Sequence, residues 1–291
     1  MSSAPGRAAC GAAAVLLTAL AALAGPASAA APKRIVALTP FSANTLASIA
    51  IKPVAIGQSL GGRERFLPSL RRIRSLPLAH PNGPNMEQLA SLRPGLVFSS
   101  PTWRKGARTM RSLDIRVVEA DPEFGRDIYD SVEEIAGIVD RERAGRRLVR
   151  RIQSKVSRAT ANLKSRPRVM LVLGVGRTPY VFLPNSWGGD LLQRAGAILV
   201  TAGAESDSGF ARISDEVIVA EDPDIIIGVP HANADDLAGI RRYMQSNQTW
   251  KLTSAGQNDR IYVSNDDSLL QADIDIAETI NSVRTRYLKN R

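Results

Sequence analysis

Cysteine is almost absent from this chain, because Cys10 is the single cysteine among 291 residues. It precedes an apolar run at residues 12–24, whereas a lipid-attachment cysteine is expected directly after such a run. The run, the positive charge before it and the small residues at 27–29 predict a cleavable export signal over residues 1–29. A mature chain that begins near Ala30 would contain no cysteine, which excludes disulfides, thiolate metal sites and cysteine nucleophiles.

Long apolar runs are also missing beyond residue 29. The run at residues 12–24 is short for a membrane span, which needs about 20 apolar residues. A membrane anchor is therefore the less favoured interpretation of the N-terminal segment. The sequence predicts export to the periplasm without a lipid anchor.

Histidine is scarce as well, since His80 and His231 are the two in the chain. Two histidines cannot supply the three-histidine set of a common class of zinc enzyme, and the sequence has neither a G-x-S-x-G nor an H-E-x-x-H motif. Gly174 and Gly176 follow a strand pattern, but a dinucleotide fingerprint would need a third glycine at Pro179, so a tight turn is favoured. These absences argue against an enzyme.

Aromatic residues make up 5% of the chain, and acidic residues are outnumbered, with a net charge of +10. Arginines cluster at residues 71–74 and 141–158. Such clusters raise the possibility of a nucleic-acid partner. An exported chain rarely meets nucleic acid, however, and few aromatic side chains are present to stack on bases. The composition favours a solvated, basic helix face near anionic lipid, with no nucleic-acid partner.

The longest predicted helix covers residues 141–165. Its apolar residues recur at steps of three and four, which indicates one buried helical face. Asp140 is expected to cap the N-terminus, and Pro167 forbids continuation. About 24 residues at ~1.5 Å each give a rod of roughly 36 Å. The apolar positions are Leu148, Val149, Ile152, Val156, Ala159 and Leu163.

The segments on either side of this helix repeat one pattern. Strand patterns open the two halves at residues 33–39 and 168–174. Later in each half, a glutamate opens a short amphipathic segment, a proline follows seven residues on, and a buried strand comes next. The glutamates are Glu87 and Glu216. The repeat predicts two similar lobes joined by the long helix.

Strands alternate with helices in both halves, which predicts α/β lobes with parallel sheets. The expected organisation is a signal peptide at 1–29, an N-terminal lobe at 30–140, a connecting helix at 141–165 and a C-terminal lobe at 166–291.

Ligands of parallel α/β sheets bind beyond the carboxyl ends of the strands, so the residues at those exits are candidate ligand contacts. They are aromatic with a charged minority, which suits a bulky, partly apolar, anionic ligand. For each aromatic side chain the alternative is ordinary core packing, which is favoured for Trp187. The candidates are Phe41, Trp103, Tyr180, Trp187, Phe210, Arg212 and Asp266.

The motif at residues 85–97, its counterpart at 216–224 and the long helix between them resemble the substrate-binding proteins of ABC importers for iron complexes and cobalamin. The resemblance extends over essentially the whole mature chain. It implies two Rossmann-like lobes, a rigid helical connector and a ligand held in the cleft. It also implies that Glu87 and Glu216 dock onto arginines of the membrane permease. The alternative role for both glutamates is stabilisation of a helix N-terminus.

The resemblance makes an iron complex, either a ferric siderophore or haem, the leading expectation for the ligand. Cobalamin is the alternative, and an exported α/β enzyme with a cleft between its lobes is less favoured. His80 lies near the position where haem-binding members carry an axial tyrosine, so it is a candidate ligand of haem iron, with an ordinary loop histidine as the alternative. Asn44 and Thr45 depart from the family pattern, which has an acidic residue in the first helix. We expect a monomer without an intrinsic cofactor.

Overall fold

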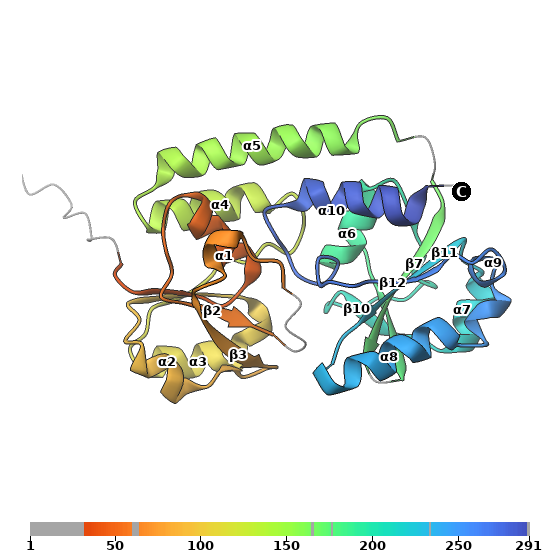
Figure 1. The fold of residues 1–291 in the computed structure, drawn as a ribbon, viewed down its shortest axis with the longest axis horizontal. Helices are drawn as coiled ribbons and strands as arrows, with labels where there is room; N and C mark the ends of the chain where they lie inside the picture. Colours follow the sequence, from red (N-terminus) through yellow and green to blue (C-terminus); the bar gives the residue numbers. More distant parts are fainter. Residues whose placement is uncertain (1–31, 60–63, 164–165, 176, 233, 290–291) are drawn as a thin grey trace, which may run out of the picture. The chain divides into compact units, whose positions relative to one another are not determined.

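The computed structural model describes most of the chain after the predicted signal peptide. Residues 32–291 form one compact unit, and the predicted signal peptide with Cys10 lies outside the described residues. The described ranges are 32–59, 64–163, 166–175, 177–232 and 234–289. Within these ranges the chain folds into two α/β lobes bridged by one long helix (Figure 1), and none of their helices combines the length and apolar character needed to cross a membrane.

The first lobe is built on a six-stranded sheet. In sheet order its strands are β4 (Gly83–Pro84), β3 (Arg74–Ala79), β2 (Ala55–Gln58), β1 (Ile35–Ala37), β5 (Leu96–Ser99) and β6 (Val117–Glu119). All neighbours are parallel except the short pair β3 and β4. Side chains alternate between two cores, with Val36 and Val97 on one face and Ala37 and Phe98 on the other. Both faces of this sheet are therefore covered, as parallel sheets require.

The second lobe has a mixed sheet. Its strands in order are β10 (Phe210–Arg212), β8 (Thr178–Phe182), β7 (Arg168–Val175), β11 (Ile225–Pro230) and β12 (Ile261–Val263), and β9 (Ile198–Leu199) also pairs with β7. Strands β7, β11 and β12 are parallel, whereas β8 and β10 are antiparallel to their neighbours. The predicted α/β lobe is thus confirmed with a largely parallel sheet, to which β8 and β10 add an antiparallel side.

The antiparallel edge has a simple cause in chain length. Val175 of β7 pairs with Thr178 of β8, which leaves two residues between the strands. A connection of two residues closes a hairpin, whereas a parallel neighbour needs a crossover of a dozen residues or more. The tight turn expected after Gly174 agrees with this register, although Gly176 itself lies outside the described residues.

Helices cover both faces of each sheet. The helices on the side of the large shared core are α1 (Pro40–Ser48), α4 (Ile128–Ile138), α6 (Trp187–Arg194) and α10 (Ile276–Val283). Those on the opposite sides are α2 (Met86–Ser91), α3 (Arg104–Ser112), α7 (Asp215–Glu221), α8 (Ala234–Ser246) and α9 (Ser254–Gln257). Short turns of 3₁₀-helix are η1 (Pro68–Leu70), η2 (Pro101–Trp103) and η3 (Trp250–Leu252), and η4 (Arg284–Leu288) is a turn of π-helix.

The long helix α5 (Glu142–Thr160) is shorter than the predicted range of 141–165. Its 19 residues span about 29 Å. Asp140 does not cap it, because this residue has a left-handed backbone with φ of 54° and the N-cap is Arg141. The helix ends at Thr160 because Ala161 has an extended backbone, so Leu163 lies beyond it and is exposed.

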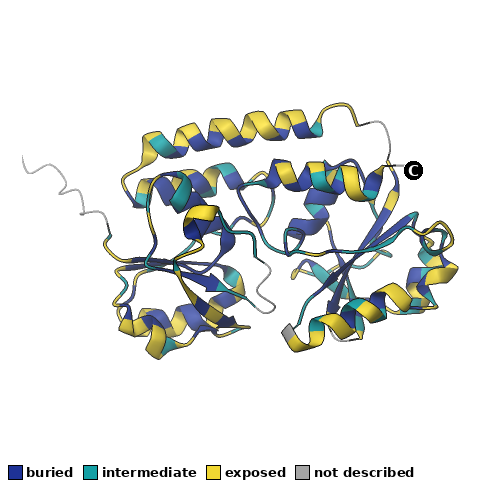
Figure 2. Cartoon of the chain, viewed as in Figure 1, coloured by how far each residue is buried: buried dark blue, intermediate teal, exposed yellow. Residues whose placement is uncertain are grey.

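Helix α5 rests on α4 and α10, with its buried face turned toward them (Figure 2). Gly145 permits the close approach, since a Cβ at this position would lie 2.4 Å from Cβ of Ala136 on α4. The apolar side chains of α5 belong to one continuous core that includes residues of both sheets, such as Phe98 and Ile227. The connector is therefore packed rather than free-standing.

Candidate functional site

A large cavity opens between the lobes, with a volume of about 1530 Å³. Its lining comes from the segments that follow β1, β5 and β6 in the first lobe and β7 and β11 in the second, together with part of α8. It therefore occupies the carboxyl edges of the parallel strands, which is where α/β proteins bind ligands.

Three polar residues at the ends of three adjacent strands form one wall of this cavity. Thr39, Ser100 and Asp121 follow β1, β5 and β6, respectively, and all line the cavity. The hydroxyl of Thr39 accepts a hydrogen bond from N of Ser42 (3.2 Å) and caps α1. The hydroxyl of Ser100 accepts from N of Thr102 (3.2 Å) at the start of η2.

Asp121 is the ionisable member of this group. Burial raises the pKa of its carboxyl to about 7, and hydrogen bonds with the hydroxyls of Thr39 and Ser100 act in the opposite direction without cancelling the effect. Its Oδ1 is buried and has no hydrogen-bond partner among the described residues. The cavity thus contains a carboxyl that changes charge near neutral pH, a property that the sequence analysis did not identify.

Aromatic side chains from both lobes form the apolar part of the lining. Trp103 is buried and meets the ring of His80 edge-on, with 6.1 Å between ring centroids. Trp187 is held by a hydrogen bond from its Nε1 to the carbonyl oxygen of Ser268 (3.0 Å). Phe210 packs edge-on against Phe182, with ring centroids 4.8 Å apart. Three of the predicted contacts, at positions 103, 187 and 210, therefore line the cavity with His80.

The charged side chains of the lining are mostly acidic. The lining contains four carboxylates and two guanidinium groups, so acid outnumbers base although the whole chain carries a net +10. The two histidines of the chain line the same cavity, His80 after β3 and His231 after β11. The carboxylates belong to Asp121, Glu123, Asp207 and Asp236, and the guanidinium groups to Arg177 and Arg242.

Four predicted ligand contacts are not part of this lining. Phe41 is completely buried in the core beneath α1. Tyr180 and Arg212 face each other across the antiparallel pair β8 and β10, so neither stands at the carboxyl end of a parallel strand. Asp266 accepts a hydrogen bond from N of Ser268 (3.0 Å) and serves its own loop. The cavity therefore gives no support to the prediction that these four residues contact a ligand.

Both predicted docking glutamates are exposed in the first turn of short helices. Glu87 lies on α2, where the Asn85 side chain accepts a hydrogen bond from N of Gln88 (2.9 Å). Glu216 lies on α7, where Ser214 provides the equivalent cap, and the hydrogen bond with the Ser214 side chain lowers the pKa of the Glu216 carboxyl. The repeat therefore places the two carboxylates at matching helix starts.

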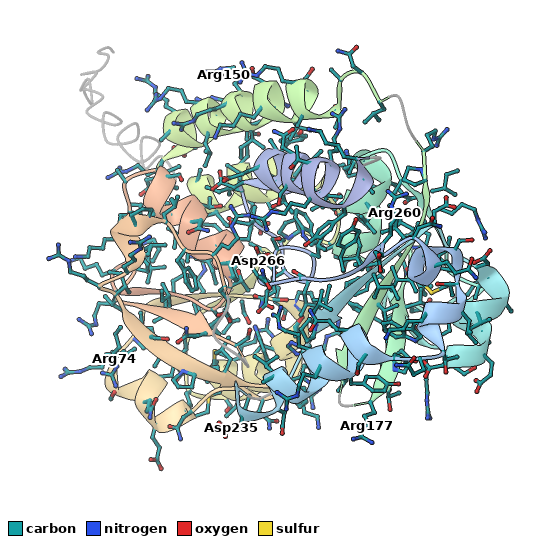
Figure 3. The ribbon with its side chains drawn as sticks, turned by 45° about the vertical axis from the view of Figure 1, so that its right-hand side comes forward. Arg74, Arg150, Arg177, Asp235, Arg260 and Asp266 are labelled. Carbon is teal, nitrogen blue, oxygen red and sulfur yellow. The ribbon has the colours of Figure 1, made fainter. Side chains whose placement is uncertain are left out.

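A second, smaller pocket of about 520 Å³ adjoins Glu216 and includes Arg212. Tyr243 and Arg177 border both this pocket and the large cavity. The hydroxyl of Tyr243 donates to Oδ2 of Asp215 (3.2 Å), the residue directly before Glu216. Figure 3 shows Arg177 at the lower edge of the second lobe, near α8. This hydrogen bond connects the cavity wall with the helix that carries Glu216.

Several of these residues were missed by the sequence analysis. The same rule of strand exits applies to Thr39, Ser100 and Asp121, which follow β1, β5 and β6. They were not predicted, because no sequence motif distinguishes such polar residues. His231 was named as one of the two histidines but was not assigned a role. Among the residues that the structure describes, no group of three or more histidine, cysteine or acidic side chains is arranged to hold a metal ion.

Comparison with known proteins gives a consistent picture. The family model described as "Periplasmic binding protein" matches residues 35–267. A curated "Cobalamin-binding protein" of Halobacterium salinarum is 26% identical over 212 residues, covering 67% of this chain and 53% of that protein. The chain therefore spans about half the length of this relative. The "High-affinity heme uptake system protein IsdE" of Staphylococcus aureus is 23% identical over 197 residues, covering 66% of this chain and 67% of that protein.

Solved structures resemble the fold over most of the chain. The structure of S. aureus IsdE complexed with heme has a TM-score of 0.73 at 20% identity, covering 88% of this chain and 99% of that one. The periplasmic vitamin B12 binding protein BtuF of Vibrio cholerae has a TM-score of 0.66 at 17% identity, with coverages of 89% and 99%. At these identities the likeness establishes the two-lobed fold and leaves the ligand open.

Proposed function

The chain belongs to the periplasmic binding protein family, and we propose that it is the extracytoplasmic substrate-binding protein of an ABC importer for an iron complex, a ferric siderophore or haem. It would carry this cargo without a cofactor of its own and without enzymatic activity. The proposal is supported by the family match over residues 35–267 and by the fold shared with haem- and vitamin B12-binding proteins. Cobalamin is the second candidate, because a curated cobalamin-binding relative is similar in sequence.

One observation carries the choice of haem among iron complexes. His80 and His231, the two histidines of the chain, both line the cavity and come from different lobes. Imidazole is a common axial ligand of haem iron, whereas the iron of a siderophore is already wrapped by its chelator. Trp103 and Trp187 add flat apolar surface suited to a macrocycle. The volume of about 1530 Å³ exceeds the roughly 300–1,000 Å³ of sites for drug-sized ligands, which suits a bulky cargo.

The test is a titration of the purified protein with haem, followed by visible spectroscopy. We expect binding with a spectrum typical of nitrogen-ligated iron. The changes His80→Ala and His231→Ala should each alter the spectrum and weaken binding, and the double variant should lose the iron ligation. Metal-free protoporphyrin is the matched control ligand, since its binding does not need an imidazole and should persist in the variants.

Other outcomes separate the alternatives. Binding of cyanocobalamin without haem would move the assignment to cobalamin. Quenching of tryptophan fluorescence by a ferric hydroxamate, with no response to haem or cobalamin, would favour a siderophore. If none of these ligands binds, the proposal that the cargo is a metal complex is overturned.

We further propose that Glu87 and Glu216 dock the carrier onto the permease. Each is exposed at a helix start, and a carboxylate can form paired hydrogen bonds with an arginine, which fix orientation as well as adding energy. Glu87→Ala and Glu216→Ala should leave ligand affinity unchanged but reduce uptake in reconstituted vesicles, and the double change should abolish it. Glu133→Ala, an exposed change on α4, is the charge-matched control. Normal uptake by the double variant would mean that both residues only stabilise the N-termini of their helices.

Export is the remaining part of the proposal. The signal over residues 1–29 and the absence of a cysteine after it support release of an unlipidated protein that begins near Ala30. N-terminal sequencing and mass measurement of the exported protein test this directly. A lipidated product, or one that keeps the first 29 residues, would contradict it.

A further inference from the structure

Positive charge is concentrated on α5. The helix carries seven basic residues and one acidic residue, Glu142, which gives it a net +6 out of the +10 of the whole chain. All seven basic side chains are exposed, while its apolar residues face the core. At about 100° per residue, Arg143, Arg147 and Arg150 point within roughly 30° of the direction opposite to the buried face. Figure 3 shows Arg150 projecting outward from the edge of the molecule.

This charge is not neutralised inside the protein. Lys155 approaches Asp275 at 4.0 Å, but none of the six arginines of α5 forms an ion pair with the described residues. Glu133 and Glu134 on the neighbouring α4 are exposed and do not reach them. Arg143 and Arg147 are four residues apart on one helix, as are three further pairs of basic residues on α5, and such like-charge pairs are destabilising. The helix thus retains a repulsion that an external anionic surface would relieve.

The position of α5 separates this face from the other surfaces of the protein. Helix α5 belongs to the shared core, whereas α2 and α7, which carry Glu87 and Glu216, pack on the opposite faces of their sheets. No residue of α5 lines the cavity. In Figure 1, α5 lies along one edge and is the outermost layer there. An extended partner can therefore approach it without touching the cavity or the docking glutamates.

We propose that the arginine face of α5 is a contact surface for an anionic phospholipid bilayer. The face is a straight rod of about 29 Å with its charges on one side, a geometry that matches a broad planar surface. Its apolar side is already buried in the core, so the contact is electrostatic, reversible and sensitive to salt. Because the docking glutamates face away, the carrier leaves the lipid when it docks, and the bilayer holds a reserve of carrier close to the permease.

The test is sedimentation of the purified exported protein with vesicles. Vesicles of phosphatidylcholine containing phosphatidylglycerol should bind the protein at low salt and release it at high salt, and vesicles of phosphatidylcholine alone should not bind it. The triple change R143Q/R147Q/R150Q should weaken binding about a hundredfold, from roughly one kcal/mol for each basic residue near an anionic surface. The triple change to lysine should retain binding, because lipid charge requires a cation and not a guanidinium fork.

The matched control removes the same charge elsewhere. R71Q/R72Q/R74Q changes three exposed arginines of the first lobe, and Arg74 lies far from Arg150 in Figure 3. Its affinity for anionic vesicles should stay within about threefold of that of the unchanged protein, since these residues are remote from α5. Far-ultraviolet circular dichroism and thermal unfolding verify that every variant is folded, and R150E is a milder second variant for the same face.

Three results would overturn the proposal. The first is that the unchanged protein does not bind anionic vesicles. The second is that both triple changes to glutamine weaken vesicle binding equally, because net charge alone would then explain the binding. The third is tighter binding to duplex DNA or another soluble polyanion than to vesicles with the same dependence on α5, which would assign the face to a different class of partner. None of these experiments involves the transported ligand, so their failure is distinct from failure of the transport proposal.

Discussion

Asp273 provides a sharp test of how burial and protonation are linked in this protein. It is 7% exposed, and its Oδ1 accepts hydrogen bonds from Nδ2 of Asn44 (2.8 Å) and from N of Ile274 (2.7 Å). Burial raises the pKa of the Asp273 carboxyl to about 7, the nearby charge of Asp275 adds to this, and the hydrogen bonds with Asn44 and Ile274 and the charge of Arg65 act against it. The contact with Asn44 joins α1 of the first lobe to the segment before α10.

The sign of the pH dependence follows from the direction of this shift. The carboxyl has a pKa of about 7 when folded and about 3.9 when unfolded, so the folded state holds the proton more tightly. Between about pH 4 and pH 7 the folded state binds more protons than the unfolded state, so the free energy of unfolding decreases as pH rises. A pKa difference of about three units corresponds to about 4 kcal/mol of free energy of unfolding as an upper limit. This stabilisation is lost completely once the pH exceeds the pKa of the folded state.

Replacing Asp273 by Asn removes this ionisation and keeps an oxygen that accepts from Asn44 and Ile274. We expect the stability difference, variant minus unchanged protein, to increase by about 2–3 kcal/mol between pH 5 and pH 8. Urea unfolding followed by tryptophan fluorescence at several pH values measures it. Asp235→Asn, an exposed change on α8 visible at the lower edge of Figure 3, controls for the loss of one negative charge. Parallel stability curves for the Asp273 variant and the unchanged protein would refute the reasoning.

Three further predictions test the cavity and its surroundings. Trp103→Ala should weaken ligand binding and also lower the free energy of unfolding by about 3 kcal/mol, because this side chain lines the cavity and is 7% exposed in the core; calorimetry and titration measure the two effects. Asp121→Asn should flatten any change in ligand affinity between pH 6 and pH 8, because the pKa of about 7 places its ionisation in this range; binding isotherms at each pH would count against this if both proteins behaved alike. Asp215→Ala should cost about 2–3 kcal/mol in thermal or denaturant unfolding, since it leaves Trp250 Nε1 and Asn247 Nδ2 without their acceptor.

The fold was predictable because its signals are local and repeated. The glutamate and proline pattern recurs in both halves, and Glu87 and Glu216 lie in the first turns of equivalent short helices. The buried runs at Leu96–Ser99 and Ile225–Pro230 are parallel strands with hydrophobic residues on both faces. The β7–β8 hairpin was not predicted, because the residue pattern of a strand does not reveal its direction. The connection of two residues between Val175 and Thr178 does indicate an antiparallel pair.

The end of α5 shows a different limit. The apolar spacing continues through Leu163, so periodicity alone extends the helix, but Ala161 turns to an extended backbone. Arg284 of the C-terminal segment then reaches the carbonyl oxygens of Ala161 (3.1 Å) and Asn162 (3.3 Å). The hydrogen-bond donor of these carbonyl groups, Arg284, is thus at least 122 residues away in sequence. A termination satisfied by so distant a residue cannot be inferred from local spacing.

The candidate site was predicted in part because exits from parallel strands are recognisable. Trp103 follows a buried strand and lines the cavity, as that rule implies. Tyr180 and Arg212 lie outside the cavity lining, because they sit opposite each other on the antiparallel strands β8 and β10. Phe41 also lies outside the lining, because the first turn of a helix that follows a strand can direct a side chain into the core as readily as into the cleft.

The uneven distribution of charge along the chain bears on the nature of the cargo. The whole chain has a net charge of +10, but α5 alone holds +6, and the cavity lining carries more carboxylates than guanidinium groups. A polyanionic chelate would meet Glu123, Asp207 and Asp236 at the exposed rim and be repelled. Haem carries two carboxylates, for which Arg177 and Arg242 are the available partners. The distribution of charge therefore favours a cargo that is mostly apolar, with one weakly anionic side directed at the second lobe.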